Sequence, residues 1–286
     1  MVVKSYAKIN LGLEILGKRP DGYHELRTLF QSISLHDVLD FELTDDPRIC
    51  LSGDSDTIAW DRTNLIYRAA HLLQQENAVQ RGIRVHVHKK IPPGSGLGGG
   101  SGNAAVTLQV LNMLWDVDLS RERLMELGAG LGADVPYFFE GGQCLGRGKG
   151  EILSPLSDLS PVFLVLVCPN FPISTARIYD ALILTSPPKE SRITKFLESG
   201  DFSLLKNDLE KTVFRLYPQL QRIKRQLSDS EAVVSLISGS GSSVFGLFFE
   251  KEKAEKALRG IGGENTALIV KTVSRGDYKK SMSIGV

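Results

Sequence analysis

The sequence has 286 residues, and its 34 Lys and Arg residues nearly balance its 33 Asp and Glu residues, so the formal net charge is +1. This balance excludes a protein that binds nucleic acid through a broad basic surface. The N-terminus shows no signal or transit pattern, and no apolar run approaches the ~20 residues that a membrane helix needs. The three cysteines form no CxxC pair, which favours free thiols in a reducing compartment. We therefore expect a cytoplasmic protein, a monomer or a homodimer, without nucleic-acid or membrane partners.

Apolar periodicity and turn residues predict the secondary structure in chain order. The first half is predicted to contain strands over residues 2–16, 27–35, 37–44 and 83–91, and helices over residues 64–76, 103–114 and 120–131. The second half is predicted to contain strands over residues 162–168, 233–238, 243–249 and 267–274, and helices over residues 175–182, 193–197, 218–227 and 251–259. Strands and helices that mix without strict alternation indicate an α+β fold. We expect two domains, residues 1–150 and 151–286, and the sequence leaves open whether the last strand returns to the first domain.

Glycine is enriched in one short segment, residues 92–102, which reads PPGSGLGGGSG. The segment joins a predicted strand to a predicted helix, so its backbone N–H groups and the helix N-terminus can face one phosphate. The Ser101 hydroxyl adds a group for a phosphate oxygen or Mg²⁺. A Walker P-loop is excluded because no Gly-Lys-Ser/Thr ends the segment. A GxGxxG spacing also matches a dinucleotide fingerprint, but Asp116 and Asp118 follow a helix and not the expected second strand.

Five segments, in chain order, resemble motifs of the GHMP kinases, the family of galactokinase, homoserine kinase and mevalonate kinase. Residues 92–105 resemble the central motif, usually written PxxxGLGSSAA. The other four are residues 5–11 (SYAKINL), 19–26 (RPDGYHEL), 132–138 (GADVPYF) and 238–245 (SGSGSSVF). The resemblance implies a two-domain GHMP kinase fold, with an N-terminal domain like domain 2 of ribosomal protein S5 and a GHMP C-terminal domain. In the central motif, Ser95 stands where Gly is usual and Gly102 where Ser is usual.

The resemblance implies that ATP is the phosphate donor and that the glycine-rich segment binds it. The implied ATP-binding residues are Pro92, Pro93, Gly94, Ser95, Gly96, Leu97, Gly98, Gly99, Gly100, Ser101 and Gly102, with Asn64 and Leu65 at the start of the preceding helix. Because Gly102 lacks a hydroxyl, the implied Mg²⁺ contact rests on Ser101.

Two charged residues in apolar surroundings are the candidate catalytic groups. Asp134 lies among small and apolar residues, where a carboxylate is costly unless it is paired. The resemblance makes it the base that takes the proton of the substrate hydroxyl. Lys8 interrupts an apolar strand, and the resemblance puts it near Asp134, where a cation keeps the aspartate ionised and stabilises the transferred group. Asn10 shares that strand face and is expected to hold substrate, whereas the residues alone leave a structural aspartate and an exposed strand lysine open.

Within the family, the motifs agree best with kinases of the non-mevalonate route to isoprenoids. These transfer phosphate from ATP to the 2-hydroxyl of a substrate that carries a cytidine diphosphate group. The resemblance implies that His24 hydrogen-bonds the cytosine and that Tyr179 stacks on it, with Phe171 as a rival for the stacking ring. The remaining implied substrate-binding residues are Asn10, Tyr23, Gly239, Ser240 and Gly241.

Other functions stay open on the sequence. One is another GHMP kinase that acts on homoserine or mevalonate, against which the PDGYH segment argues. The others are a dinucleotide-binding oxidoreductase and a non-catalytic nucleotide-binding module. His86 and His88 form an HxH pair without an evident third metal ligand. Asn207-Asp208 precede a helical segment, and we interpret them as its cap.

Overall fold

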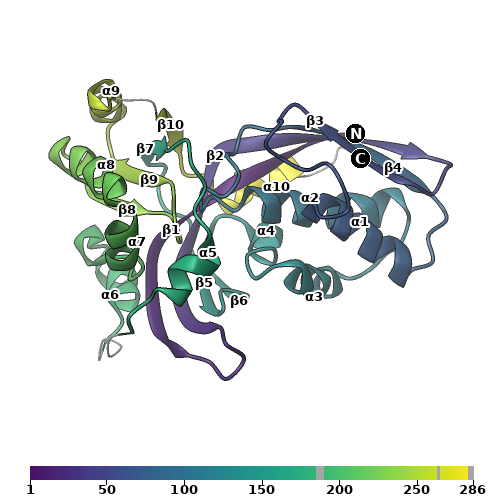
Figure 1. Cartoon of the computed structure of the whole chain (residues 1–286), viewed down its shortest axis with the longest axis horizontal. Helices are drawn as coiled ribbons and strands as arrows, with labels where there is room; N and C mark the ends of the chain where they lie inside the picture. The colour runs from purple at the N-terminus through teal and green to yellow at the C-terminus, as the bar shows by residue number, and fades with distance from the viewer. Residues whose placement is uncertain (185–189, 263–264, 283–286) are drawn as a thin grey trace.

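The computed structural model describes residues 1–184, 190–262 and 265–282. Within these residues, the first sheet contains β1 (Val2–Lys18), β2 (His24–Thr44), β3 (Ile49–Gly53), β4 (Gly82–His88), β5 (Gln143–Gly148) and β6 (Ile152–Pro155). The second contains β7 (Phe163–Cys168), β8 (Val234–Ile237), β9 (Val244–Phe248) and β10 (Thr266–Lys271). Figure 1 shows one sheet in each half of the molecule, with the long β1–β2 ribbon of the first sheet reaching from the first half to the junction of the two. These sheets and their helices confirm the predicted α+β class.

β1 and β2 form the backbone of the first half. They pair antiparallel along most of their length, with Lys8 opposite Ser32 and Asn10 opposite Phe30. β2 also pairs antiparallel with β4 and β5, β3 runs parallel to β4, and β6 pairs antiparallel with β5. β2 is thus one continuous strand where the sequence suggested two.

The helices of the first half begin where the sequence supplies caps. They are α1 (Leu65–Glu76), α2 (Gly99–Leu114), α3 (Arg121–Leu131) and the short α4 (Tyr137–Glu140). The Asn64 side chain accepts a hydrogen bond from the Ile66 amide at the start of α1, and Ser120 caps α3 in the same way. α1 contacts α2 and α3, and α2 contacts β1 and β2. α2 begins at Gly99, four residues before the predicted start, because its first turn is made by glycines that the sequence indicated as loop.

The second half consists of an antiparallel sheet with helices packed against it. The helices are α5 (Thr175–Asp180), α6 (Arg192–Ser199), α7 (Glu210–Leu216), α8 (Pro218–Asp229) and α9 (Lys251–Gly260), with a 3₁₀ turn at Phe202–Leu204. α8 contacts β8 and β9, whereas α9 contacts β7 and β10. The two halves share a buried cluster in which Ile9 and Leu29 of the first sheet pack with Leu166 and Phe245 of the second. This shared core holds the halves together.

The C-terminal segment crosses back to the first half. β10 pairs with β7 in the second sheet, and Thr272, the residue after it, forms an isolated antiparallel bridge with Ile33 of β2 in the first sheet. After it, α10 (Arg275–Met282) packs against β1, and the Tyr278 hydroxyl donates to the Phe138 carbonyl over 2.6 Å. β6 still belongs to the first sheet. We therefore propose to move the domain division from Gly150 to the residues after Pro155.

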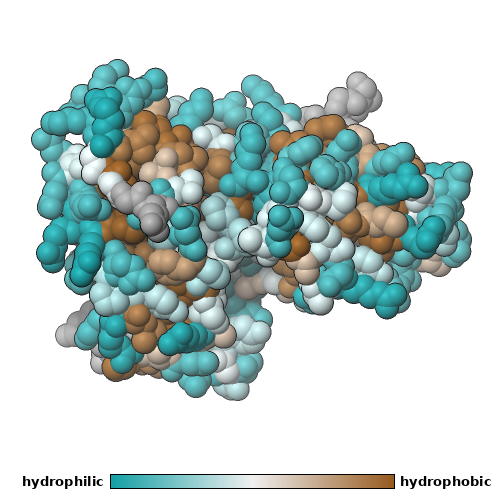
Figure 2. All heavy atoms as spheres, turned by 45° about the horizontal axis from the view of Figure 1, so that its top comes forward, coloured by the Kyte–Doolittle hydropathy of each residue, from teal (hydrophilic) through white to brown (hydrophobic). Residues whose placement is uncertain are grey.

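The surface has no dominant apolar face in the view of Figure 2, where hydrophilic residues cover the outer edges of both halves. In the part of the chain that the structure describes, no helix has the length and apolar character needed to cross a membrane.

Candidate active site

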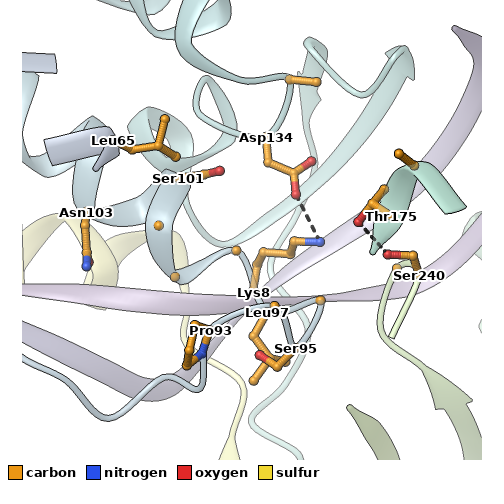
Figure 3. A pocket seen from close by; sticks show the side chains of 18 of the residues that line it. Lys8, Leu65, Pro93, Ser95, Leu97, Ser101, Asn103, Asp134, Thr175 and Ser240 are labelled. Atoms are coloured by element: carbon orange, nitrogen blue, oxygen red, sulfur yellow. Dashed lines mark hydrogen bonds and ion pairs between the residues drawn. The ribbon is translucent and has the colours of Figure 1, made fainter. Parts of the chain in front are cut away.

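A cavity of about 890 Å³ is lined by residues from both halves. The predicted site residues on its wall are Lys8, Asn10, Tyr23, His24, Asn64, Leu65, the ten residues 92–101, Asp134, Tyr179, Gly239 and Ser240. Figure 3 shows Lys8 and Asp134 pointing toward each other, with Ser101 at the start of α2 on one side and Thr175 and Ser240 on the other. The tertiary fold thus brings five separate sequence motifs to one cavity.

The glycine-rich segment is held by its carbonyl groups. The Gly94 carbonyl accepts from the Ile173 amide over 3.2 Å, and the Ser95 carbonyl accepts from the Ser243 amide over 3.0 Å. The Gly96 carbonyl accepts from the Ser238 hydroxyl, and the Leu97 carbonyl accepts from the Lys8 amide, over 2.9 Å each. Three of these donors lie in the second half and one lies on β1. The segment therefore spans both halves and takes its shape from each.

The amides at the start of α2 are available for a ligand. Gly98, the N-cap, has a φ of 71° and no side chain, so the helix begins without a capping side chain. The N–H groups of Gly99, Gly100 and Ser101 begin the helix and have no intrahelical acceptor. These donors and the positive end of the helix dipole suit the binding of an anion in the cavity. A Cβ on Gly98 would stand 2.7 Å from the Phe138 ring, so no larger residue fits there.

Lys8 and Asp134 form an ion pair in the cavity. The distance from Lys8 Nζ to Asp134 Oδ2 is 3.2 Å. Only 4% of the Lys8 side chain is exposed, whereas 35% of the Asp134 side chain is exposed to the cavity. Lys8 Nζ also donates to Asn10 Oδ1 over 2.7 Å, and Asn10 Nδ2 donates to the Thr28 hydroxyl over 2.7 Å. The lysine is thereby fixed from β1 and β2, and the carboxylate keeps an open side toward a substrate.

A second lysine lies beside the glycine-rich segment. Lys89 lines the cavity and pairs with the fully buried Asp37 over 2.5 Å. Asp37 also accepts hydrogen bonds from the amides of Lys90 and Ile91, over 2.8 Å each, and from Asn103 Nδ2 over 3.1 Å. Burial lowers the pKa of Lys89 despite the opposing attraction of Asp37. Asp37 therefore ties β2 to the chain that enters the glycine-rich segment and to the first turns of α2.

Aromatic rings form the other end of the cavity. The His24 and Tyr179 rings stack with centroids 5.1 Å apart and an angle of 29° between their planes. Burial, with a smaller contribution from Lys18, lowers the pKa of His24, which keeps the imidazole neutral near pH 7. Burial, together with the nearby charge of Asp134, raises the pKa of the Tyr179 hydroxyl. Lys149 Nζ lies 4.5 Å from the centre of the exposed Tyr23 ring. Planar rings and a cation thus line the region where the two halves meet.

Some predicted residues lie off the cavity wall. Gly102 is buried on the inner side of α2, where a Cβ would stand 2.9 Å from Ser5 Oγ, so its role is close packing against β1. Gly241 has a φ of 87° and donates its amide to the Ser238 carbonyl within a turn. Phe171 stacks on Tyr217 in the second half, whereas Tyr179 is the ring on the cavity wall.

Two further sequence interpretations are corrected. The N-cap residue of α7 is Leu209 and not Asn207; Asn207 Oδ1 accepts from the Leu209 amide, and its side chain amide donates to the carbonyls of Ile237 and Gly239. The dinucleotide fingerprint is wrong because β4, the strand before it, pairs antiparallel with β2, not within a doubly wound parallel sheet. The sequence analysis also missed Asp37, Lys89 and Lys149 as residues of the site. Two signals were available: the pair Lys89-Lys90 directly before the glycine-rich segment, and the position of Lys149 between two glycines.

His86 and His88 lie on β4. His86 bonds Ser52 and His88 pairs with Asp54, and no group of three or more metal-ligating side chains occurs among the residues that the structure describes.

The fold and the site together define a small-molecule kinase of the GHMP type. Residues 64–142 match the family described as GHMP kinases N terminal domain, and residues 193–265 match GHMP kinases C terminal.

Relatives narrow the family further. A 4-diphosphocytidyl-2-C-methyl-D-erythritol kinase from Thermodesulfovibrio yellowstonii is 40% identical over 274 residues, which cover 92% of this chain and 95% of that protein. A crystal structure of 4-(cytidine 5'-diphospho)-2C-methyl-D-erythritol kinase is 35% identical with a TM-score of 0.82, covering 95% of this chain and 99% of that one. A homoserine kinase structure from Cytophaga hutchinsonii has a TM-score of 0.74 at 19% identity, with 96% of this chain and 95% of that one covered, and shares the fold alone. The chain belongs to the GHMP kinase family and, within it, to the 4-diphosphocytidyl-2-C-methyl-D-erythritol kinases.

Proposed function

We propose that this protein transfers the γ-phosphate of ATP to the 2-hydroxyl of 4-diphosphocytidyl-2-C-methyl-D-erythritol, and so releases the 2-phosphate and ADP in the non-mevalonate route to isoprenoids. The observation that carries the proposal is the joint position of three groups on one cavity. These are the open amides of α2, the Lys8–Asp134 pair and the His24–Tyr179 rings. Each matches one part of the reaction: the phosphate donor, the reacting hydroxyl and the cytosine.

ATP fits the end of the cavity near α1 and α2. The free N–H groups of Gly99, Gly100 and Ser101 suit its phosphate oxygens. The starts of the two helices are close, because a Cβ on Gly100 would stand 3.5 Å from Leu65 Cδ1. Asn64 and Leu65 therefore flank the nucleotide, and Lys89 lies within reach of its phosphates.

In the transfer step, Asp134 Oδ accepts the proton of the substrate hydroxyl as the hydroxyl oxygen attacks the γ-phosphorus. The bond between that phosphorus and the bridging oxygen of ADP breaks in line, and the proton later leaves Asp134 for solvent. Lys8 holds the carboxylate in place and, with the α2 amides, offsets the charge spread over the transferred oxygens. Because Lys8 is almost fully buried and bonded to Asn10, it needs little reorganisation in this step.

Mg²⁺ accompanies ATP in this proposal and neutralises charge on its phosphate oxygens. The donor set fits a cation held mainly by the nucleotide, because the described residues contain no cluster of three metal-ligating side chains. Ser101 is the residue that we propose as its protein contact. Its hydroxyl lies on the cavity at the start of α2 (Figure 3).

The cytidine end of the substrate fits the ring-lined region. We propose that the cytosine stacks against Tyr179 and Tyr23 and bonds His24. The turn at Gly239 and Ser240 faces the middle of the substrate. In this arrangement the substrate spans the junction of the two halves, so both are needed to bind it. The cytoplasmic location and the monomeric or homodimeric state stay predictions.

The test is ADP release with ATP and each of three acceptors: the cytidine diphosphate substrate, homoserine and mevalonate. We expect turnover with the first acceptor and none above background with the other two. Turnover with homoserine or mevalonate alone would replace the proposed substrate while keeping the kinase chemistry. Binding of NAD(P) without binding of ATP would overturn the kinase itself.

A further inference from the structure

Asn207 is a buried asparagine outside the cavity whose side chain reaches the third glycine-rich motif. It is 3% exposed. Its Nδ2 donates to the Ile237 carbonyl over 2.9 Å and to the Gly239 carbonyl over 2.7 Å, while its Oδ1 accepts from the Leu209 amide over 3.0 Å. Both N–H groups of the side chain amide therefore donate hydrogen bonds, one to the end of β8 and one to the turn that follows it.

That turn, residues 238–241, contacts the catalytic strand and the phosphate-binding segment. The Ser238 hydroxyl accepts a hydrogen bond from the Asn10 amide over 3.3 Å and donates to the Gly96 carbonyl over 2.9 Å. A Cβ on Gly239 would stand 3.2 Å from Asn10 Oδ1 and 3.7 Å from Lys8 Nζ. A shift of the turn would therefore act on Lys8, on Asn10 and on the segment at once.

Asn207 is itself anchored to β1. The Leu13 amide donates to the Lys206 carbonyl and the Asp208 amide donates to the Leu13 carbonyl, over 2.9 Å each. Asp208 Oδ2 accepts from the Ile15 amide over 3.0 Å. The chain around Asn207 is thus a short parallel addition to the free edge of β1.

The same strand β1 carries Lys8 and Asn10, so the hydrogen bonds close a ring. The ring runs from β1 through residues 206–208 and the Asn207 amide to the turn, and returns to β1 through Ser238. Glu210 strengthens this ring of hydrogen bonds. Its Oε1 accepts from the Ile237 amide over 3.1 Å, and Asn207 Nδ2 donates to the Ile237 carbonyl. Both backbone polar groups at the end of β8 are therefore held from the start of α7.

We propose that Asn207 is a positioning residue for the phosphoryl transfer, an inference that rests on the proposed function. Its amide fixes the 238–241 turn, and the turn fixes Asn10 and the Gly96 carbonyl relative to Lys8. Asn207 touches neither substrate. Its loss changes the geometry at Lys8, and we expect it to lower kcat more than it raises either KM.

The test compares Asn207→Ala and Asn207→Asp with Asn112→Ala and Asn112→Asp. Asn112 is a matched control, because its side chain also bonds backbone through both its oxygen and its nitrogen, at the amide and carbonyl of Leu119, but lies far along α2 from the turn. We expect Asn207→Ala to lower kcat roughly 10- to 100-fold, as for a displacement of the order of 1 Å at a reacting group. The KM for ATP should change less than about threefold, and the Asn112 variants should keep wild-type kcat per folded molecule.

Asn207→Asp supplies a signature that a merely structural role would not produce. An ionised carboxylate repels the carbonyls of Ile237 and Gly239, whereas the protonated acid donates to one of them. The ratio of the variant kcat to the wild-type kcat should therefore rise as the pH is lowered, and the same ratio for Asn207→Ala should stay flat. Measurements are confined to the pH range in which circular dichroism shows each variant folded.

Hydrogen exchange gives a readout that uses no substrate. The amides of Gly241 and Ser243 are bonded to Ser238 and Ser95, so Asn207→Ala should speed their exchange at least about 10-fold, whereas Asn112→Ala should not. Unchanged exchange at these amides overturns the inference, and so does faster exchange with wild-type kcat. If the wild-type protein does not phosphorylate the cytidine substrate, the proposed function fails, and the exchange measurement still decides whether Asn207 holds the turn.

Discussion

Replacing Asp37 by asparagine turns two attractive contacts of a buried carboxylate into repulsive ones. Asp37 Oδ1 accepts the amides of Lys90 and Ile91, and Oδ2 accepts Lys89 Nζ and Asn103 Nδ2. If the asparagine keeps its oxygen toward the two amides, its NH₂ group points at the Lys89 ammonium and at the Asn103 amide. All three groups are donors, so two hydrogen bonds are lost and a buried cation is left without its carboxylate.

The size of the effect follows from the burial of the pair. Asp37 is fully buried and the Lys89 side chain is 7% exposed. Removing one partner of such a pair costs about 3–5 kcal/mol of unfolding free energy. That is a large part of the roughly 5–15 kcal/mol by which a typical domain is stable. Because Lys90 and Ile91 lead into the glycine-rich segment, the KM for ATP should rise as well.

The assay is urea unfolding of four proteins: wild type, Asp37→Asn, Lys89→Met and the double variant. Lys89→Met removes the uncompensated cation, so the double variant should recover about 2 kcal/mol relative to the sum of the single losses. Asp54→Asn is the control, because Asp54 also accepts a backbone bond from Lys89 but is half exposed. A loss below about 1 kcal/mol for Asp37→Asn, or a double variant no better than that sum, would refute the reasoning.

Three further predictions concern the site. Lys8→Met and Asp134→Asn should each lower kcat at least about 100-fold, since the carboxylate takes the proton and the lysine holds it in place; steady-state kinetics checks this. Gly96→Ala should lower kcat/KM roughly 100-fold, because its Cβ would stand 2.2 Å from the Ser238 carbonyl oxygen at a φ of 78°. The pKa of His24 is lower in the folded chain than in the unfolded chain, where it is about 6.5. The unfolded chain therefore binds more protons as the pH falls below about 6.5, and the free energy of unfolding should decrease there. His24→Gln should flatten that part of the Tm–pH curve and raise the KM for the cytidine substrate more than that for ATP.

Each of these three predictions has a control or an outcome that would contradict it. Near-wild-type kcat in either charge variant would remove Lys8 and Asp134 from the proposed roles. Gly130→Ala, where a Cβ meets nothing within 4 Å, should leave kinetics unchanged, and an equal loss there would show that the Gly96 effect is not local. Equal effects of His24→Gln on both KM values would count against the proposed cytosine contact.

Much of the fold was predictable from local sequence. The caps Asn64 and Ser120 and the periodic segments behind them predicted α1 and α3, and alternation predicted β4 and β7. The start of α2 was not predictable, because glycines have poor helix propensity and only the packing of Gly99 and Gly102 against neighbouring chain holds them in a helix. α10 was missed because its charged residues lack a clear apolar period, and it is held mainly through Tyr278 and its contacts with Tyr6 and Phe138.

The sequence by itself, through its motifs and their resemblance to the GHMP kinases, predicted the chemistry-bearing residues: a glycine-rich segment for phosphate, one lysine and one aspartate in apolar surroundings, and a histidine with a nearby turn. Such motifs are local, since each is a short run of residue types in a fixed order. Only the tertiary structure decided how they are held. The carbonyls of the segment are taken up by groups more than 70 residues away in the sequence, Asp37 reaches Lys89 from another strand, and Asn207 joins β1 to the 238–241 turn. Such contacts depend on how sheets and helices pack, because a side chain's long-range partners lie in other elements whose arrangement no local pattern contains.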